Sequence, residues 1–456
     1  MKKIFTYILF AQLIFLSCKK SEVEPIFEES ANKRVTTVLD SYKKQLVGSE
    51  FGWKGVYYPD GGNAGGYTFY LKFDAMGKVS MYSDIDGFTY FPTGYDKAFE
   101  TTYQVKAQQT PTLVFDSYSY LTELVNPDYN SGTGQKADLE LGFQSVTADK
   151  ITLVGNVNKT QMILTKLTKV ESDILTKGGL ASVFNGTFDF INTPKFIVLT
   201  FPTGEKTDVA IDLAAKQLAL YFVNAKNEPD LVSSAFSITA TGIQLKDPIK
   251  LYGVTFQELF WDDVKKIYYL NVGGRRTDLA YSSKPSLTFY YALGNLFQSF
   301  IMSPSIPTQS TEFKALYDKI KSNVITLSTA PPVRVLGNIS LQYQPDNGVF
   351  ALFIDYTRTE TNGTVVFNGA GVLFYQPTLD SRGNIKFTRL ASNGTYYYDF
   401  DQFLSGISGI VATGVKPLTD VLENNTFQWD YDPVADRTAV LKSTGTPSIT
   451  IKGVLF

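Results

Sequence analysis

The sequence predicts a mainly β protein (α+β), built from tandem antiparallel meander-sheet modules with a few amphipathic helices. Short segments with apolar residues at every second position recur along the chain, with turn-forming residues between them. Aromatic residues make up 14% of the chain, and aromatic side chains suit pleated surfaces. A length of 456 residues also exceeds what one core usually organises, so two or three domains are expected.

The first module is expected to begin with a helix. Its apolar residues repeat at the spacing of one helix face, which we interpret as core packing rather than a partner-binding face. They are Val35, Val38, Leu39, Tyr42 and Leu46. Strands follow at 53–58, 67–73, 78–82, 139–143, 151–155 and 161–164. Residues 59–66 contain four glycines. We interpret them as a flexible hairpin loop rather than a phosphate cradle, since no helix follows.

The same pattern recurs in two later stretches. Strands are predicted at 184–190 and 196–201, and again at 339–343 and 349–356. A second amphipathic helix precedes the last pair, with Thr311 as its expected cap. Its apolar face consists of Phe313, Leu316, Tyr317, Ile320 and Val324. The expected modules are therefore residues 28–170, 171–302 and 303–456.

The N-terminus predicts an exported, lipidated protein. Two lysines precede a short apolar run, and Ser17 then stands directly before Cys18, which is the sole cysteine of the chain. This arrangement is typical of a secretory signal, and a cysteine at this point resembles the bacterial lipobox. We expect a signal peptide at 1–17 and a lipidated tether at 18–27. Membrane lipid would be a partner through Cys18, and the outer membrane, with the cell surface favoured, is the expected location.

Composition excludes many functions. The chain contains no histidine, so it cannot supply a Ser-His-Asp triad or a histidine-ligated zinc site. We expect no enzyme, no catalytic residues and no cofactor. The formal net charge is −2, and no basic stripe indicates nucleic-acid binding.

Aromatic residues beside the glycine-rich segment are the candidate ligand-binding residues. Trp53, Tyr57 and Tyr67 flank residues 59–66 and are candidates for a stacking platform. Alternation along the first strand places Trp53 and Tyr57 on one face and Tyr58 on the other. Burial of one set, without any ligand, is the alternative.

Acidic segments are weak candidates for calcium. Asp430, Asp432 and Asp436 supply oxygen ligands at close spacing, and Asp84 and Asp86 form a second short acidic loop. Neither segment matches a full calcium loop, so no metal site is assigned. Asp262 and Asp263 would point to opposite faces if extended, and a turn with solvated acids is expected there.

Several segments together resemble a lipoprotein family of the Bacteroidota, known only as domain of unknown function 4302. They are the lipobox, residues 51–55, 66–73 and 242–249, and then Gly253 and Phe260-Trp261-Asp262. Such proteins are often encoded beside SusC-like TonB-dependent transporters and SusD-like lipoproteins. The resemblance therefore implies an accessory role in nutrient uptake, with a glycan or peptide as ligand, and it supplies no catalytic residues. A structural or adhesive envelope lipoprotein and a carboxylate-dependent glycoside hydrolase are the alternatives.

Overall fold

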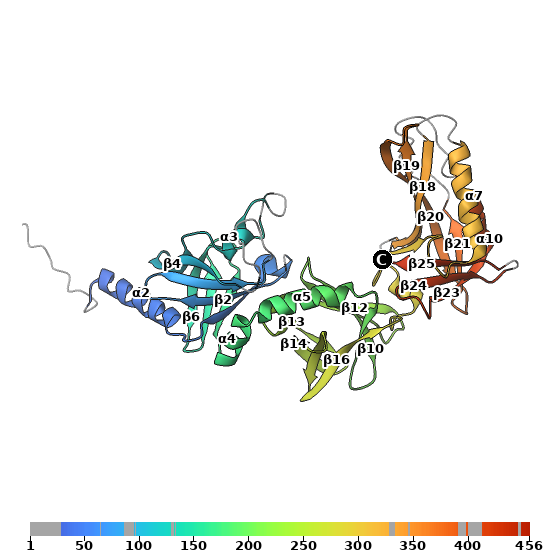
Figure 1. Ribbon diagram of the computed structural model, residues 1–456. Coiled ribbons are helices and arrows are strands. Elements are labelled where there is room, and N and C mark those ends of the chain that lie inside the picture. The colour runs from blue at the N-terminus through green and yellow to red at the C-terminus, as the bar shows by residue number, and fades with distance from the viewer. Residues whose placement is uncertain are drawn as a thin grey trace, which may run out of the picture.

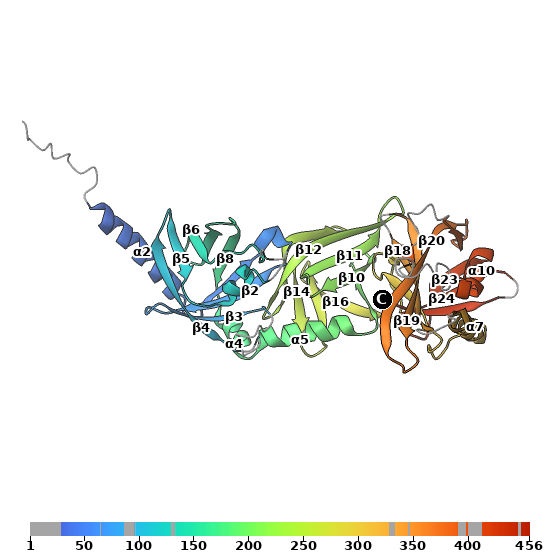
Figure 2. The same cartoon turned by 90° about the horizontal axis from the view of Figure 1, so that it is seen from above.

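Three closed antiparallel β-barrels follow one another along the chain. The computed structural model describes residues 29–63, 65–85, 95, 97–128, 132, 134–327, 333–344, 347–390, 398–399, 413–445 and 448–456. The barrels lie in a row, with the first helix at the outer end of the first barrel (Figure 1). The view from above shows the same order (Figure 2). The predicted mainly β, antiparallel fold class is therefore confirmed.

Barrel 1 is an eight-stranded meander that closes by pairing its first and last strands. Helix α2 (Ala31–Val47) precedes it, capped by the Ser30 side chain, and α3 (Tyr120–Val125) lies between its fifth and sixth strands. The strands are β1 (Trp53–Tyr57), β2 (Tyr67–Phe73), β3 (Lys78–Ser83), β4 (Phe99–Ala107), β5 (Pro111–Phe115), β6 (Glu140–Val146), β7 (Lys150–Gly155) and β8 (Gln161–Lys166). A short 3-10 turn, Pro59–Gly62, follows β1.

Barrel 2 repeats this topology and closes through β9 and β16. Helices α4 (Lys169–Thr176) and α5 (Gly179–Asn192) connect it to barrel 1. Its strands are β9 (Phe196–Thr200), β10 (Lys206–Asp212), β11 (Gln217–Val223), β12 (Pro229–Thr239), β13 (Gly242–Leu251), β14 (Val254–Asp262), β15 (Ile267–Val272) and β16 (Arg275–Ser282).

Residues 184–190, where we expected a strand, form part of helix α5 instead. The apolar residues also fit helical spacing, and Leu180, Val183 and Phe190 are buried on one face of α5. The helix approaches barrel 2 closely: a Cβ atom at Gly186 would lie 2.2 Å from the ring of Trp261. The apolar residues of this segment fit both strand alternation and helical spacing. Packing against barrel 2 therefore favoured the helix.

The Trp261-Asp262-Asp263 segment leads into a turn, which the carboxylates of Asp262 and Asp263 stabilise by accepting hydrogen bonds. The Asp262 carboxylate accepts hydrogen bonds from the backbone N–H groups of Val264 and Lys265. Asp263 accepts hydrogen bonds from Lys266 and from Ser182 of α5. These contacts, with one from Trp261, lower the pKa of Asp263 to about 2. The acids therefore stabilise the turn and its contact with α5, and the prediction of a turn is confirmed.

Barrel 3 also closes as a ring of eight strands. The first strand, β17, pairs with the last, β25, and the β19–β20 pair completes the ring. The strands are β17 (Ser299–Met302), β18 (Val333–Gln344), β19 (Val349–Thr359), β20 (Val365–Leu379), β21 (Ile385–Arg389), β23 (Thr426–Tyr431), β24 (Thr438–Ser443) and β25 (Thr450–Leu455), with β22 (Tyr398–Asp399) added on β20. Its helices are α6 (Phe289–Ala292), α7 (Thr311–Leu327) and α10 (Lys416–Asn424).

The third module therefore begins before residue 303, where we placed its start. β17 pairs with β18 and β25, so residues 299–302 belong to barrel 3. Helix α7 lies after this strand rather than at the head of the module. Its cap is Ser310, one residue before the expected Thr311, because the Ser310 hydroxyl accepts a hydrogen bond from the N–H of Phe313.

Each barrel forms a separate hydrophobic core made largely of bulky side chains. Trp53, Tyr57 and Phe69 are fully buried in barrel 1, Phe236 and Tyr268 in barrel 2. In barrel 3, Phe300, Phe350, Tyr375 and Phe387 are fully buried. An eight-stranded barrel is just wide enough for such side chains to fill it. Within the described ranges, these large side chains fill the interior of each barrel.

No helix in the described ranges combines the length and the apolar composition needed to cross a membrane.

Candidate functional site

The structure separates the three aromatic residues that were predicted as a stacking platform. Trp53 and Tyr57 are both 0% exposed, so they form no exposed platform. The indole N–H of Trp53 donates to the carbonyl of Leu46, and the Tyr57 hydroxyl accepts a hydrogen bond from the N–H of Asp138. Both residues belong to the core of barrel 1. Tyr67 is half-buried and lines a cavity at the contact with barrel 2.

The acidic candidates for calcium serve as structural groups. The Asp432 carboxylate is buried, accepts a hydrogen bond from the N–H of Val434 and lies 2.5 Å from the ammonium of Lys452. Asp430 accepts a hydrogen bond from the N–H of Tyr431. Within the described ranges, no group of three or more Asp, Glu, His or Cys residues is placed to hold a metal ion, so Asp436 gains no such partners.

Asp84, from the second acidic loop, is a buried link between barrels 1 and 2. Its carboxylate accepts hydrogen bonds from the N–H of Thr68 in barrel 1 at 2.7 Å and of Ile238 in barrel 2 at 2.8 Å. It also lies 2.7 Å from the ammonium of Lys216, and both side chains are almost fully buried. The Lys216 ammonium is 4.2 Å from the centre of the Tyr67 ring. Asp84, which we considered as part of a weak calcium candidate, instead forms an interdomain ion pair. Asp86 lies outside the described residues.

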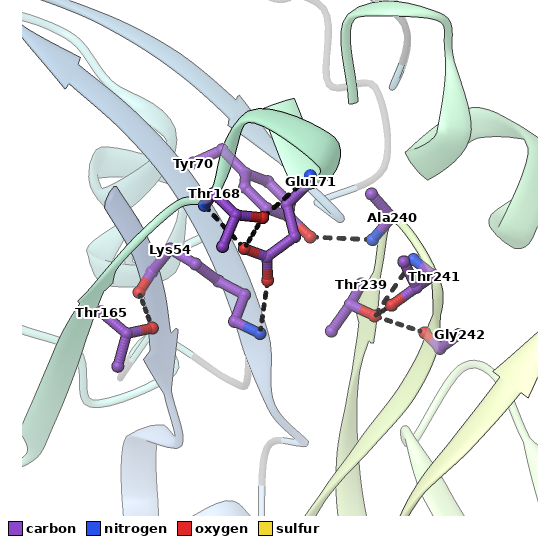
Figure 3. A network of polar contacts seen from close by, with 9 residues as sticks. All are labelled: Lys54, Tyr70, Thr165, Thr168, Glu171, Thr239, Ala240, Thr241 and Gly242. Carbon is purple, nitrogen blue, oxygen red and sulfur yellow. Dashed lines mark hydrogen bonds and ion pairs between the residues drawn. The ribbon is translucent and has the colours of Figure 1, made fainter. Parts of the chain in front are cut away.

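Barrel 1 covers an open edge of strand β12. This strand pairs with β11 up to Ala235 and only with β13 from Phe236 onward. The carbonyl of Phe236 accepts a hydrogen bond from the N–H of Gly66. The N–H of Ala240 donates to the Tyr70 hydroxyl at 2.8 Å, as Figure 3 shows. Together with the Asp84–Ile238 contact, these bonds satisfy backbone groups that an edge strand would otherwise expose.

The glycine-rich segment packs into the contact between barrels 1 and 2, which we call the joint. It is not the flexible hairpin loop that we expected. The carbonyls of Gly62 and Gly66 accept hydrogen bonds from the side chains of Gln217 and Lys216. A Cβ atom at Gly66 would lie 2.2 Å from the ring of Tyr58 and 2.9 Å from the carbonyl oxygen of Phe236. Glycine is therefore required here by close contact with the ring of Tyr58 and with the backbone of barrel 2. The sequence could not show this, because the contacting residues of barrel 2 are 150 or more positions away.

Helix α4 begins beside the same joint. Thr168 and Glu171 form a capping box at its start. The other carboxylate oxygen of Glu171 faces Lys54 of β1, at 3.8 Å, and Figure 3 shows both residues near the β12–β13 turn. The ammonium of Lys54 is thereby held at the border of a cavity between the two barrels.

This polar cavity has a volume of about 710 Å³. One wall is the outer face of β1 and β8, where Val56 pairs with Ile163 and Lys54 with Thr165. The facing wall comes from β13 and β14 of barrel 2. The lining residues are Lys54, Val56, Tyr58, Gly61, Asn158, Lys159, Thr160, Gln161, Ile163, Thr165, Gln244, Leu245, Lys246, Asp247 and Gln257.

Four side-chain amides and three ammonium groups are among the polar groups that line this cavity. The amide nitrogen of Gln257 donates to the carbonyls of Leu245 and Lys246, and that of Gln244 donates to the carbonyl of Gln257. These bonds fix both amides in place. Within the described part of the chain, neither amide oxygen has a hydrogen-bond donor. The polar cavity therefore offers oriented acceptors beside the ammonium groups of Lys54, Lys159 and Lys246.

A second cavity, of about 770 Å³, borders the other part of the joint and is mainly apolar. It is lined by Phe184 and Phe188 of α5, by Leu124 of α3 and by residues 210–214. Tyr67, Glu123 and Lys216 at its wall each have further interactions within the chain. We therefore place the candidate site in the polar cavity, whose lining residues the sequence analysis did not single out. The cavity arises only when two barrels meet, so no local motif indicates it.

The fold and this site define a tandem eight-stranded β-barrel protein with an open cavity between its first two barrels. Residues 23–263, which are slightly more than half of the chain, match the family described as Domain of unknown function (DUF4302). The chain belongs to this family, as the resemblance predicted. The match covers barrel 1 and most of barrel 2, including both walls of the polar cavity.

No curated protein matches the chain. Among solved structures, one described as "Crystal structure of lipopolysaccharide binding protein" is 8% identical. The alignment covers 93% of this chain and 96% of that chain, with a TM-score of 0.13. At that score the likeness carries no argument about fold or function.

Proposed function

We propose that this protein is an outer-membrane lipoprotein that binds a glycan in the polar cavity, as an accessory of a SusC/SusD-like uptake system. The observation that carries the proposal is the cavity of about 710 Å³ between barrels 1 and 2. Ligand sites occur preferentially at domain interfaces, and filled barrels direct the ligand to such an interface. The lipobox supports the membrane anchor, although Cys18 lies outside the described residues.

The chemistry of the cavity favours a glycan over a peptide. A sugar hydroxyl can donate to the amide oxygens of Gln244 and Gln257 and accept from the ammonium groups on the cavity walls. Amides stand on both walls, with Gln161 on β8 facing the β13–β14 side that carries Gln244 and Gln257. The paired side chains of Val56 and Ile163 add an apolar strip, against which the C–H face of a sugar ring can pack.

The glycoside hydrolase alternative gains no support from this site. Glycoside hydrolysis usually requires two carboxyl groups that flank one bond. Asp247 is the single carboxylate among the described residues that line the polar cavity. We therefore propose binding without turnover at this position.

Loss of an amide from either wall is expected to weaken glycan binding. Gln161→Ala and Gln257→Ala each remove one hydrogen-bonding group, so the Kd for a bound oligosaccharide should rise about threefold to tenfold. A glycan array would first identify a bound oligosaccharide, and titration calorimetry would then compare the variants. Gln376→Ala, at an amide of barrel 3 far from the cavity, is the matched control. The proposal fails if no glycan binds, or if both cavity variants bind like the unaltered protein.

The anchor and the uptake partner have their own test. Protein tagged at the C-terminus and extracted from native outer membrane in mild detergent should co-purify with a TonB-dependent transporter and a SusD-like lipoprotein. Cys18→Ala should release the protein from the membrane fraction, because acyl chains supply the attachment. Recovery of the protein alone, or only with copies of itself, would instead favour a structural or adhesive envelope role.

A further inference from the structure

Helix α2 carries an apolar stripe that barrel 1 covers only at its C-terminal end. Leu46 is 1% exposed, and the ring of Tyr42 stacks on Phe143 with 4.4 Å between the centroids. Farther toward the N-terminus, Val35 is 45% exposed and Val38 is 40% exposed. The expectation that this whole face packs in the core is thus correct for the last turns of the helix and wrong for the first ones.

The uncovered part of α2 extends beyond the barrel. Its C-terminal end is held by the Trp53 hydrogen bond to Leu46 and by the Gln45 side chain, which donates to the carbonyl of Thr147. The N-terminal half projects from the end of the row opposite to barrel 3 (Figures 1 and 2). Helices in proteins gain most of their stability when their apolar face packs against another surface. The exposed apolar stripe at this end of α2 is therefore suited to packing against a partner.

The charge of α2 indicates which partner. Its N-terminal half, residues 31–39, contains Lys33 and Arg34 and no acidic side chain, and Lys33 pairs with Glu29 just before the helix at 2.8 Å. Lys33 and Arg34 stand near its start, and its first turn contains no acid. Positive charge at a helix N-terminus opposes the helix dipole, and a nearby anionic surface would offset this cost.

We propose that the N-terminal half of α2 lies on an anionic lipid surface, with Val35 and Val38 inserted at the level of the headgroups. Interfacial helices combine an apolar stripe with basic residues in this way. This inference rests on the proposed lipid anchor, since Ser30 is only twelve positions after Cys18. Such a tether spans at most about 40 Å, so the acyl chains would hold α2 close to the bilayer. Barrel 1 then stands nearest to the membrane and barrel 3 farthest from it.

Flotation with vesicles tests this contact without the acyl chains. The mature chain carrying Cys18→Ser should bind vesicles of phosphatidylcholine with phosphatidylglycerol more strongly than vesicles of phosphatidylcholine alone. Binding should weaken at high salt, because screening shortens the reach of the helix charges. The double variant Val35→Ser/Val38→Ser should bind about tenfold more weakly, from the loss of buried apolar area. Val264→Ser is the matched control, because Val264 is 93% exposed at a turn of barrel 2.

Equal binding by the double variant, or no binding of the unlipidated chain to either vesicle, would overturn the inference. Self-association in sedimentation that the double variant abolishes would also overturn it, by assigning the stripe to a second copy of the chain. The thermal unfolding of the double variant should be unchanged, since both valines are largely exposed. A negative vesicle result leaves the lipid anchor standing, because membrane release by Cys18→Ala tests that anchor separately.

Discussion

Asp84→Ala is expected to lower the free energy of unfolding by about 3–5 kcal/mol, because it leaves a buried lysine without its carboxylate. Asp84 and Lys216 are nearly inaccessible to solvent, and the carboxylate also accepts two backbone hydrogen bonds, one from each barrel. Denaturant unfolding followed by tryptophan fluorescence would measure the loss. Asp84 accepts hydrogen bonds from both barrels, so barrels 1 and 2 should lose stability together in this variant.

A double variant separates the ion pair from the backbone contacts. Asp84→Ala/Lys216→Met removes the buried ammonium as well, so it should recover part of the loss. Recovery should stay incomplete, since the N–H groups of Thr68 and Ile238 still lack their acceptor, at about 1–3 kcal/mol each. Asp173→Ala is the control, because the Lys169–Asp173 pair is exposed to solvent and should contribute little to stability. An effect of Asp84→Ala as small as that control would contradict the buried joint.

Trp53→Ala is expected to destabilise the protein by about 3–5 kcal/mol through the cavity that it leaves in barrel 1. Trp53 is 0% exposed, and its indole N–H ties the end of α2 to the first strand. Thermal unfolding by calorimetry would show this loss. Glycan affinity, measured at a temperature where the variant remains folded, should not change.

The opposite pattern would restore the stacking platform that the sequence first suggested. If Trp53→Ala left stability intact and weakened glycan binding, the indole would be a ligand contact. Phe188→Ala is a suitable control, since Phe188 is 55% exposed and its truncation should change stability by only about 0.5 kcal/mol. The pair of variants therefore distinguishes an aromatic core residue from an aromatic surface residue by two independent readouts.

Much of the local structure was predictable, because each element carries its own periodicity. Alternation along 53–58 placed Trp53 and Tyr57 on one face, and the structure puts that face inside barrel 1. The spacing from Phe313 to Val324 predicted α7, with both of those residues fully buried. The prediction at 184–190 was wrong, because Leu180, Val183 and Phe190 form a buried helical face, and Phe190 packs against Trp261 and Tyr268 of barrel 2.

The sequence by itself determined that the chain is a series of antiparallel meanders, and which side chains face a core in elements such as β1 and α7. Strand alternation and helix spacing indicate, for each residue, which face of its element the side chain occupies. Only the tertiary structure decided that each meander closes into a barrel, that Asp84 reaches Lys216 and that amides from two barrels line one cavity. Periodicity indicates on which face of a helix or strand a side chain lies, but not which residues of other elements it contacts. Those partners lie about eighty or more positions apart in the chain, and only packing brings them together.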